Sequence, residues 1–124
     1  MHQSPTKPLR HVIITGGAGF IGSQISARLI KGKTRVTILT RNVSAPRATA
    51  LAQQGCKVVP CDLADAHRIP RPDTLDPADT LFHFAADVSV NSPTLRAANV
   101  DGTSRAVALA DVLAIHYVVY ASRI

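Results

Sequence analysis

The sequence is poor in aromatic residues and in cysteine, and it contains no long apolar run. Its 124 residues include no tryptophan, two tyrosines, three phenylalanines and two cysteines. Cys56 and Cys61 have no metal-ligating partners nearby, so we interpret them as ordinary thiols in a reducing cytoplasm and predict no metal site. No segment is long enough to span a membrane, and the start, MHQSPTKPLR, lacks the apolar segment of a signal peptide.

Acidic residues are also scarce. The sequence has eight acidic residues (Asp and Glu) and fourteen basic residues (Lys and Arg), which gives a formal net charge of +6. This excess favours anionic partners such as nucleotides and phosphates. The basic residues are scattered and form no stripe interleaved with aromatic residues, so nucleic-acid binding is the least favoured function. Because 46% of the residues are hydrophobic, we expect a buried core rather than a disordered chain.

Segments typical of strands alternate with segments typical of helices. The predicted strands are rich in Val, Ile and Leu; they are His11–Thr15, Arg35–Leu39, Lys57–Pro60, Thr80–Phe84 and Tyr117–Ala121. The predicted helices are Phe20–Lys31, with Gly32 as its stop signal, Ala45–Gln54 and Pro93–Ile115. This alternation indicates βαβ units and a parallel sheet that is covered on both faces. We predict a loose tail over residues 1–10 and a single domain over residues 11–124.

A glycine-rich turn follows the first predicted strand, in the stretch VIITGGAGFIG that ends at Gly22. Its glycines satisfy both G-x-G-x-x-G and G-x-x-G-x-x-G. An early glycine permits a tight turn, a middle one lets the backbone approach a pyrophosphate, and the last allows close packing of helix and strand. The phosphates would then lie at the helix N-terminus, where free N–H groups favour anions. Because the turn lies between a strand and a helix, the pattern predicts a dinucleotide site rather than a purely structural turn.

Here the sequence resembles the extended short-chain dehydrogenases/reductases, the NAD(P)-dependent epimerase/dehydratase family. The matching segments are TGGAGFIG, CDLAD, HFAADVSV, NVDGT and VVYAS, in the family's order, and they cover nearly the whole chain. The resemblance implies that Asp62 contacts the adenine, and that His83 has a structural or cofactor-side role rather than acid/base work. The cofactor-binding residues it implies are Gly16, Gly19, Phe20, Ile21, Gly22, Asp62, Leu63, Ala85, Ala86, Asn99 and Ser122.

The resemblance also implies the fold. We expect an α/β protein with a Rossmann-type doubly wound parallel sheet of about five strands in the order 3-2-1-4-5. The chain would stop before the later strands and the substrate region of the family.

The end of the second predicted strand bears on the choice of cofactor. NAD binding requires an acidic residue there to accept hydrogen bonds from the ribose, but this sequence has Thr40 and Arg41. A guanidinium suits a 2′-phosphate, because it offers a planar fork of donors and a fixed charge. We therefore predict NADP as the cofactor and keep NAD as the alternative.

The residues that carry the family's chemistry are missing. The family uses a tyrosine with a lysine four residues later, Y-x-x-x-K, whose lysine lowers the pKa of the phenol. Here Ala121 follows Tyr117 at that spacing, and Ile124 follows Tyr120. Where many members have a second serine, the pair reads Ser122-Arg123. We therefore predict no catalytic residue in this chain.

Three functional hypotheses remain. The preferred one is the cofactor-binding portion of an enzyme that acts on a sugar nucleotide, or on a similar alcohol or carbonyl substrate, by hydride transfer. The second is a catalytically dead NADP-binding sensor with a protein partner. The third is a shortened gene product with no function of its own.

The fifth predicted strand would form an edge of the sheet. Its run, YVVYA, is apolar and uncharged, and unpaired backbone groups on such an edge can pair with another chain. We predict self-association through this edge, and exposed apolar side chains on the fourth and fifth strands.

Overall fold

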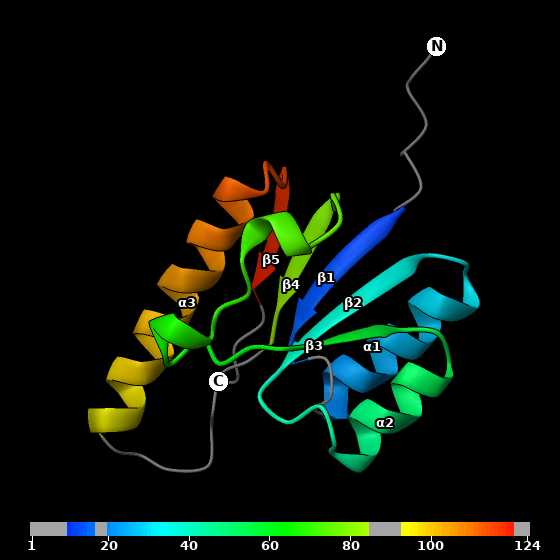
Figure 1. The fold of residues 1–124 in the computed structure, drawn as a ribbon, viewed down its shortest axis with the longest axis horizontal. Coiled ribbons are helices and arrows are strands. Elements are labelled where there is room, and N and C mark those ends of the chain that lie inside the picture. The colour runs from blue at the N-terminus through cyan, green and yellow to red at the C-terminus, as the bar shows by residue number, and fades with distance from the viewer. Residues whose placement is uncertain (1–9, 17–19, 85–92, 121–124) are drawn as a thin grey trace.

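The computed structural model describes residues 10–16, 20–84 and 93–120, and within these ranges the predicted sheet is confirmed. Five parallel strands lie in the order β3-β2-β1-β4-β5 (Figure 1). The strands are β1 (His11–Thr15), β2 (Arg35–Thr40), β3 (Lys57–Pro60), β4 (Thr80–His83) and β5 (Tyr117–Tyr120). From β1 the chain first adds β2 and β3 on one side and then β4 and β5 on the other, as in a doubly wound fold.

The helices form a layer on each face of the sheet (Figure 1). Helices α1 (Phe20–Lys31) and α2 (Pro46–Gln53) cover one face, and α3 (Pro93–Val112) covers the other. The segment between β3 and β4 contains two short 3₁₀ helices, η1 (Ala66–Arg68) and η2 (Pro72–Thr74). None of the helices in the described ranges is long and apolar enough to cross a membrane.

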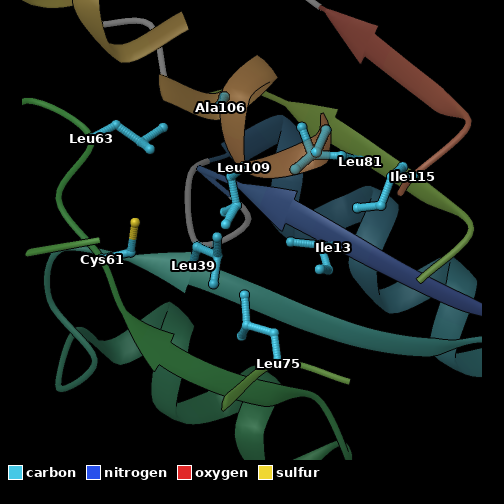
Figure 2. Packing of buried hydrophobic residues seen from close by; sticks show 10 residues of the cluster. Ile13, Leu39, Cys61, Leu63, Leu75, Leu81, Ala106, Leu109 and Ile115 are labelled. Carbon is cyan, nitrogen blue, oxygen red and sulfur yellow. The ribbon is translucent and has the colours of Figure 1, made fainter. Parts of the chain in front are cut away.

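The core has two halves because successive side chains of β1 point to opposite faces of the sheet. Val12 and Ile14 pack with residues of β2 and α2 in one half. Ile13 packs in the other half with Leu81 and Leu109, the latter from α3 (Figure 2). Every residue of β1 is buried, which explains its continuous apolar run.

Several element bounds differ from the prediction. Helix α2 spans Pro46–Gln53 rather than Ala45–Gln54, β2 ends at Thr40 rather than Leu39, and β4 ends at His83 rather than Phe84. Helix α3 ends at Val112 rather than Ile115, because Ala114 adopts a left-handed φ of 56° and turns the chain. Helix α1 does end at Lys31, but the left-handed residue that closes it is Lys33, with φ 68°, and not Gly32. In both places backbone N–H groups beyond the helix bond to its last carbonyls, and this pattern stops a helix without requiring glycine.

Strand β5 lies at the edge of the sheet, as predicted, and all four of its residues are exposed. The expected exposure of β4 is wrong. Leu81 is fully buried, and Thr80 and His83 are also buried, because α3 and the neighbouring strands cover them. The exposed apolar side chains at this end of the sheet are therefore those of β5.

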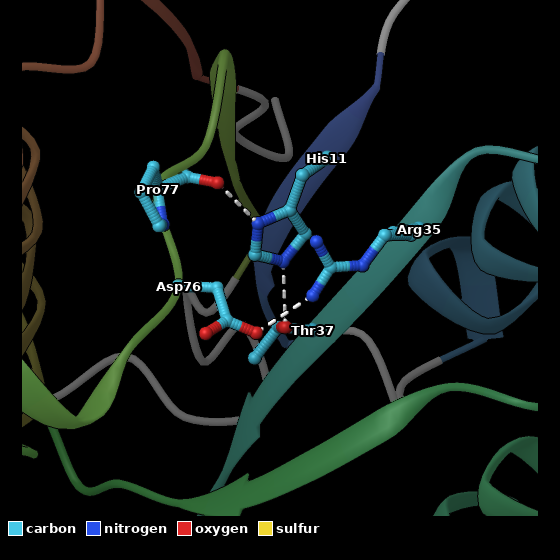
Figure 3. Close-up of polar contacts among 5 residues, drawn as sticks. All are labelled: His11, Arg35, Thr37, Asp76 and Pro77. Atoms are coloured by element: carbon cyan, nitrogen blue, oxygen red, sulfur yellow. Dashed lines mark hydrogen bonds and ion pairs between the residues drawn. The ribbon is translucent and has the colours of Figure 1, made fainter.

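The amino ends of the strands are joined to the segment before β4 by polar contacts (Figure 3). His11 Nδ1 lies 2.7 Å from the Pro77 carbonyl oxygen, and His11 Nε2 lies 2.7 Å from the Thr37 hydroxyl. Because a carbonyl can only accept, Nδ1 carries the proton toward Pro77. Arg35 pairs with Asp76 at 2.6 Å. These contacts fix the end of the sheet opposite to the glycine-rich turn.

Asp79 adds a pH-dependent contact at this end. Its Oδ2 accepts the N–H groups of His11 at 3.1 Å and Arg10 at 2.8 Å, and these bonds lower the pKa of the carboxyl. Because the pKa of Asp79 is lower in the folded state than in the unfolded state, ionised Asp79 stabilises the fold at pH values above the unfolded-state pKa of about 3.9. This stabilisation is lost as the pH falls toward the pKa of the folded state.

We expect Asp79→Asn to lower the free energy of unfolding at neutral pH by less than about 1 kcal/mol, because the side chain is partly exposed and the amide oxygen can still accept. The difference from the wild type should shrink below roughly pH 4. Urea unfolding across that range measures it, and a difference that grows on acidification would contradict the assignment.

Candidate functional site

The glycine-rich turn begins at the carboxyl end of β1. Gly16 adopts φ 70°, a left-handed conformation that favours glycine, and its N–H donates to the Leu39 carbonyl of β2 at 3.3 Å. Helix α1 then starts at Phe20, so strand, turn and helix follow one another as the motif requires. Within α1, the Ser26 hydroxyl donates a hydrogen bond to the Gly22 carbonyl at 2.7 Å, and the Ile21 side chain is exposed.

Several predicted cofactor residues lie outside the described part of the chain. These are Gly19, Ala85, Ala86 and Ser122. Phe20 begins α1 and Asn99 lies within α3, but their side chains are also outside the described part.

A pocket of about 310 Å³ lies beyond the carboxyl ends of β2 and β3. It brings together two predicted residues from different loops, Arg41 after β2 and Asp62 after β3. The two strand ends are held side by side, because the Cys61 N–H donates to the Thr40 carbonyl at 2.9 Å. The other lining residues are Pro60, Cys61, Arg68, Ile69 and Pro70.

Asp62 is held in a tight turn. Its Oδ1 accepts the Ala64 N–H at 2.9 Å, so the carboxylate both shapes the loop and lines the pocket. The next residue, Leu63, does not line the pocket; its side chain is buried in the core on the α3 side (Figure 2). The buried Leu63 side chain therefore anchors the loop to the core.

His83, at the carboxyl end of β4, links three elements. Its Nδ1 lies 2.6 Å from the Thr15 hydroxyl of β1, its Nε2 lies 3.2 Å from the Thr103 hydroxyl of α3, and its ring stacks on Tyr120 of β5. Burial lowers the pKa of His83, which favours the neutral ring. These contacts give His83 a structural role; the resemblance had implied a structural or cofactor-side role rather than acid/base chemistry.

The cysteine that lines the pocket is not activated for nucleophilic attack. Burial raises the pKa of the Cys61 thiol to about 11, and the neighbouring Asp62 charge adds to the shift. The thiol therefore stays protonated near neutral pH and is a poor nucleophile. No cluster of three or more metal-ligating side chains occurs within residues 10–16, 20–84 and 93–120.

The sequence analysis missed two residues at this site. Arg68 lines the pocket, and Arg105 of α3 donates through Nη1 to the Leu63 carbonyl at 2.6 Å. Both had been counted among scattered surface charges. Their places depend on how the segment after β3 folds back, and no residue pattern in that segment signals this.

Comparisons with known proteins agree with this architecture. The model of the "NAD dependent epimerase/dehydratase family" matches residues 12–122. A curated relative, probable UDP-arabinose 4-epimerase 3 of Arabidopsis thaliana, is 35% identical over 92 residues, which are 68% of this chain and 22% of that protein. The chain thus spans about a fifth of the length of the curated relatives it matches first.

Solved structures show the same fold. A UDP-galactose 4-epimerase superposes with a TM-score of 0.74 at 26% identity, over 90% of this chain and 38% of that one. The UDP-glucose-4-epimerase from Stenotrophomonas maltophila, solved with bound NAD, gives a TM-score of 0.75 at 23% identity, over 91% and 37% of the two chains. With the family model matched from the first strand to the end of the fifth, this chain belongs to the NAD-dependent epimerase/dehydratase family.

Proposed function

We propose that this chain is the dinucleotide-binding portion of an enzyme that transfers hydride to or from a sugar nucleotide or a similar alcohol or carbonyl substrate. The observation that carries this proposal is the pocket at the carboxyl ends of β2 and β3, which is lined by both Arg41 and Asp62. The substrate class is supported by the relatives, several of which are described as UDP-arabinose 4-epimerases.

The residues present fit an adenine dinucleotide. Asp62 can accept hydrogen bonds from an adenine amino group, and the N-terminus of α1, which follows the glycine-rich turn, is the kind of place that binds a pyrophosphate. When bound, the nicotinamide supplies or accepts the hydride; the part of this chain is to hold the adenosine end.

We further propose that the cofactor is NADP, with NAD as the alternative. The family description and the Stenotrophomonas relative name NAD, so this preference depends on a feature of this chain. That feature is Arg41, an exposed cation that lines the pocket where an acidic residue would bind the ribose of NAD.

Calorimetric titration with NADPH and NADH tests the proposed function. Saturable binding of either dinucleotide would support it, and tighter binding of NADPH would support the NADP assignment. No binding of either at millimolar concentration would contradict it.

We expect this chain to lack turnover by itself, because neither tyrosine is followed by a lysine at the required spacing. The second candidate function is a catalytically dead NADP sensor, which the same missing pair favours. Both hypotheses, a cofactor-binding portion and a dead sensor, predict no turnover when the purified chain is incubated with UDP-sugars. Stereospecific turnover would contradict both and show that the active site has been misidentified.

We also propose that the chain self-associates through β5. All four β5 residues are exposed, and β5 is the last strand of the sheet, so one row of its backbone groups has no strand partner within the described residues.

Val119→Lys should reduce this association, because a charge on an edge strand opposes pairing. Val119 is 42% exposed, so the substitution leaves the core unchanged. Val107→Lys, at an α3 position that is 51% exposed, is the matched control and should have no effect. Sedimentation velocity measures the outcome, and a wild-type monomer at high concentration would contradict the proposal.

The cytoplasm is our proposed location. Cys56 and Cys61 are both free and buried, and they belong to different halves of the core. Such thiols suit a reducing compartment.

A further inference from the structure

The pocket beyond β2 and β3 is lined by a second arginine that the proposed function has not used. Arg41 comes from the loop after β2, and Arg68 ends η1 in the segment after β3. Both side chains are exposed, and both line the pocket that contains Asp62.

The backbone of Arg68 is fixed by hydrogen bonds within its own loop. The Asp62 N–H donates to the Arg68 carbonyl at 3.1 Å, and the Arg68 N–H donates to the Asp65 carbonyl at 2.9 Å. The Asp65 carboxylate in turn accepts the His67 N–H at 2.9 Å. The loop therefore closes on itself, and this closure holds the Arg68 backbone beside Asp62, from which the exposed Arg68 side chain lines the pocket.

The same loop is anchored to the core and to α3. Leu63 is buried, and its carbonyl accepts the Arg105 guanidinium at 2.6 Å. Gly102 of α3 faces Leu63 closely, since a Cβ added there would lie 3.5 Å from the Leu63 Cβ. Because the loop is held at both ends, a ligand would meet Arg68 without first ordering the backbone, which favours binding.

The charges of the pocket lining favour an anion. Within the described ranges the ion pairs are Arg35–Asp76 and Arg71–Asp73, so neither pocket arginine is neutralised by a carboxylate there. Asp62 is the carboxylate of the lining, and its Oδ1 already accepts the Ala64 N–H. The pocket thus offers two guanidinium groups against one carboxylate.

We propose that Arg68 is a second ligand of the adenosine 2′-phosphate, opposite Arg41, so that two loops together determine the preference for NADP. This inference rests on the proposed function. Two guanidinium groups can share the oxygens of one phosphate dianion, and each adds charge-assisted hydrogen bonds. A guanidinium at this place could instead stack on the adenine, which would favour NADPH and NADH equally.

Arg68→Gln tests the proposal by titration of the full chain with NADPH and with NADH. We expect NADPH to bind about tenfold more weakly, because a charge-assisted contact is lost, while NADH binding stays unchanged. Arg71→Gln is the matched control: Arg71 lies in the next turn and pairs with Asp73 at 2.9 Å, and it is not part of the pocket lining. It should leave both affinities as in the wild type.

Each other outcome overturns the proposal in a recognisable way. An equal loss for both dinucleotides would assign Arg68 to adenine stacking, and no loss for either would remove it from the site. In both cases the wild type still binds, so the proposed function stands. If the wild type binds neither dinucleotide, the proposed function fails and this inference fails with it.

Discussion

Arg41→Asp should reverse the dinucleotide preference of this chain. The guanidinium lines the pocket at the end of β2, and aspartate there removes the charge that attracts a 2′-phosphate and adds one that repels it. The new carboxylate can also accept hydrogen bonds from the ribose hydroxyls of NAD. We expect the ratio of NADPH to NADH affinity to change by about a hundredfold, with most of the change in NADPH binding.

Lys57→Asp is the charge-matched control for this variant. Lys57 is exposed at the amino end of β3, away from the pocket, and the substitution changes the net charge by the same amount. Calorimetry on both variants separates a local effect from a general one. Equal losses of NADPH affinity would show that the overall positive charge, rather than Arg41, attracts the cofactor.

Ile13→Ala should have the largest effect on stability. Ile13 is fully buried in the middle of the central strand and packs with Leu39, Leu81 and Leu109 between the sheet and α3 (Figure 2). Truncating a buried isoleucine to alanine removes apolar burial and leaves a cavity, at a cost of about 2–5 kcal/mol. That loss is a large part of the stability of a small domain.

Ile21→Ala provides the matched comparison, because Ile21 is 61% exposed on α1 and its truncation leaves no cavity. Denaturant unfolding of the two variants should therefore give very different midpoints. Similar midpoints would mean that Ile13 is not at the centre of the core.

The parts of the fold that the sequence predicted are those with strong local signals. The bounds of β1, α1 and β3 match the prediction, because continuous apolar runs and a 3.6-residue period mark them. The helix ends were less predictable. Ala114 and Lys33 adopt left-handed conformations that glycine normally signals, so the sequence pointed to other stopping residues.

Arg41 was predicted from its position after the second strand and Asp62 from the family resemblance, and the structure brings both to one pocket. Their contact with a cofactor stays a prediction. Leu63 was predicted to contact the cofactor, but the loop turns its side chain into the core. Arg68 could not be identified, because its place depends on backbone bonds to Asp62 and Asp65.

We propose that a dinucleotide binds at the carboxyl ends of β1, β2 and β3. Chemical-shift mapping of the backbone amides during titration with NADPH locates its binding site. We expect the largest shifts at Gly16, Arg41 and Asp62, and little change at His11 and Asp79 at the amino end of the sheet. Shifts concentrated at the amino end, or none at saturating NADPH, would contradict it.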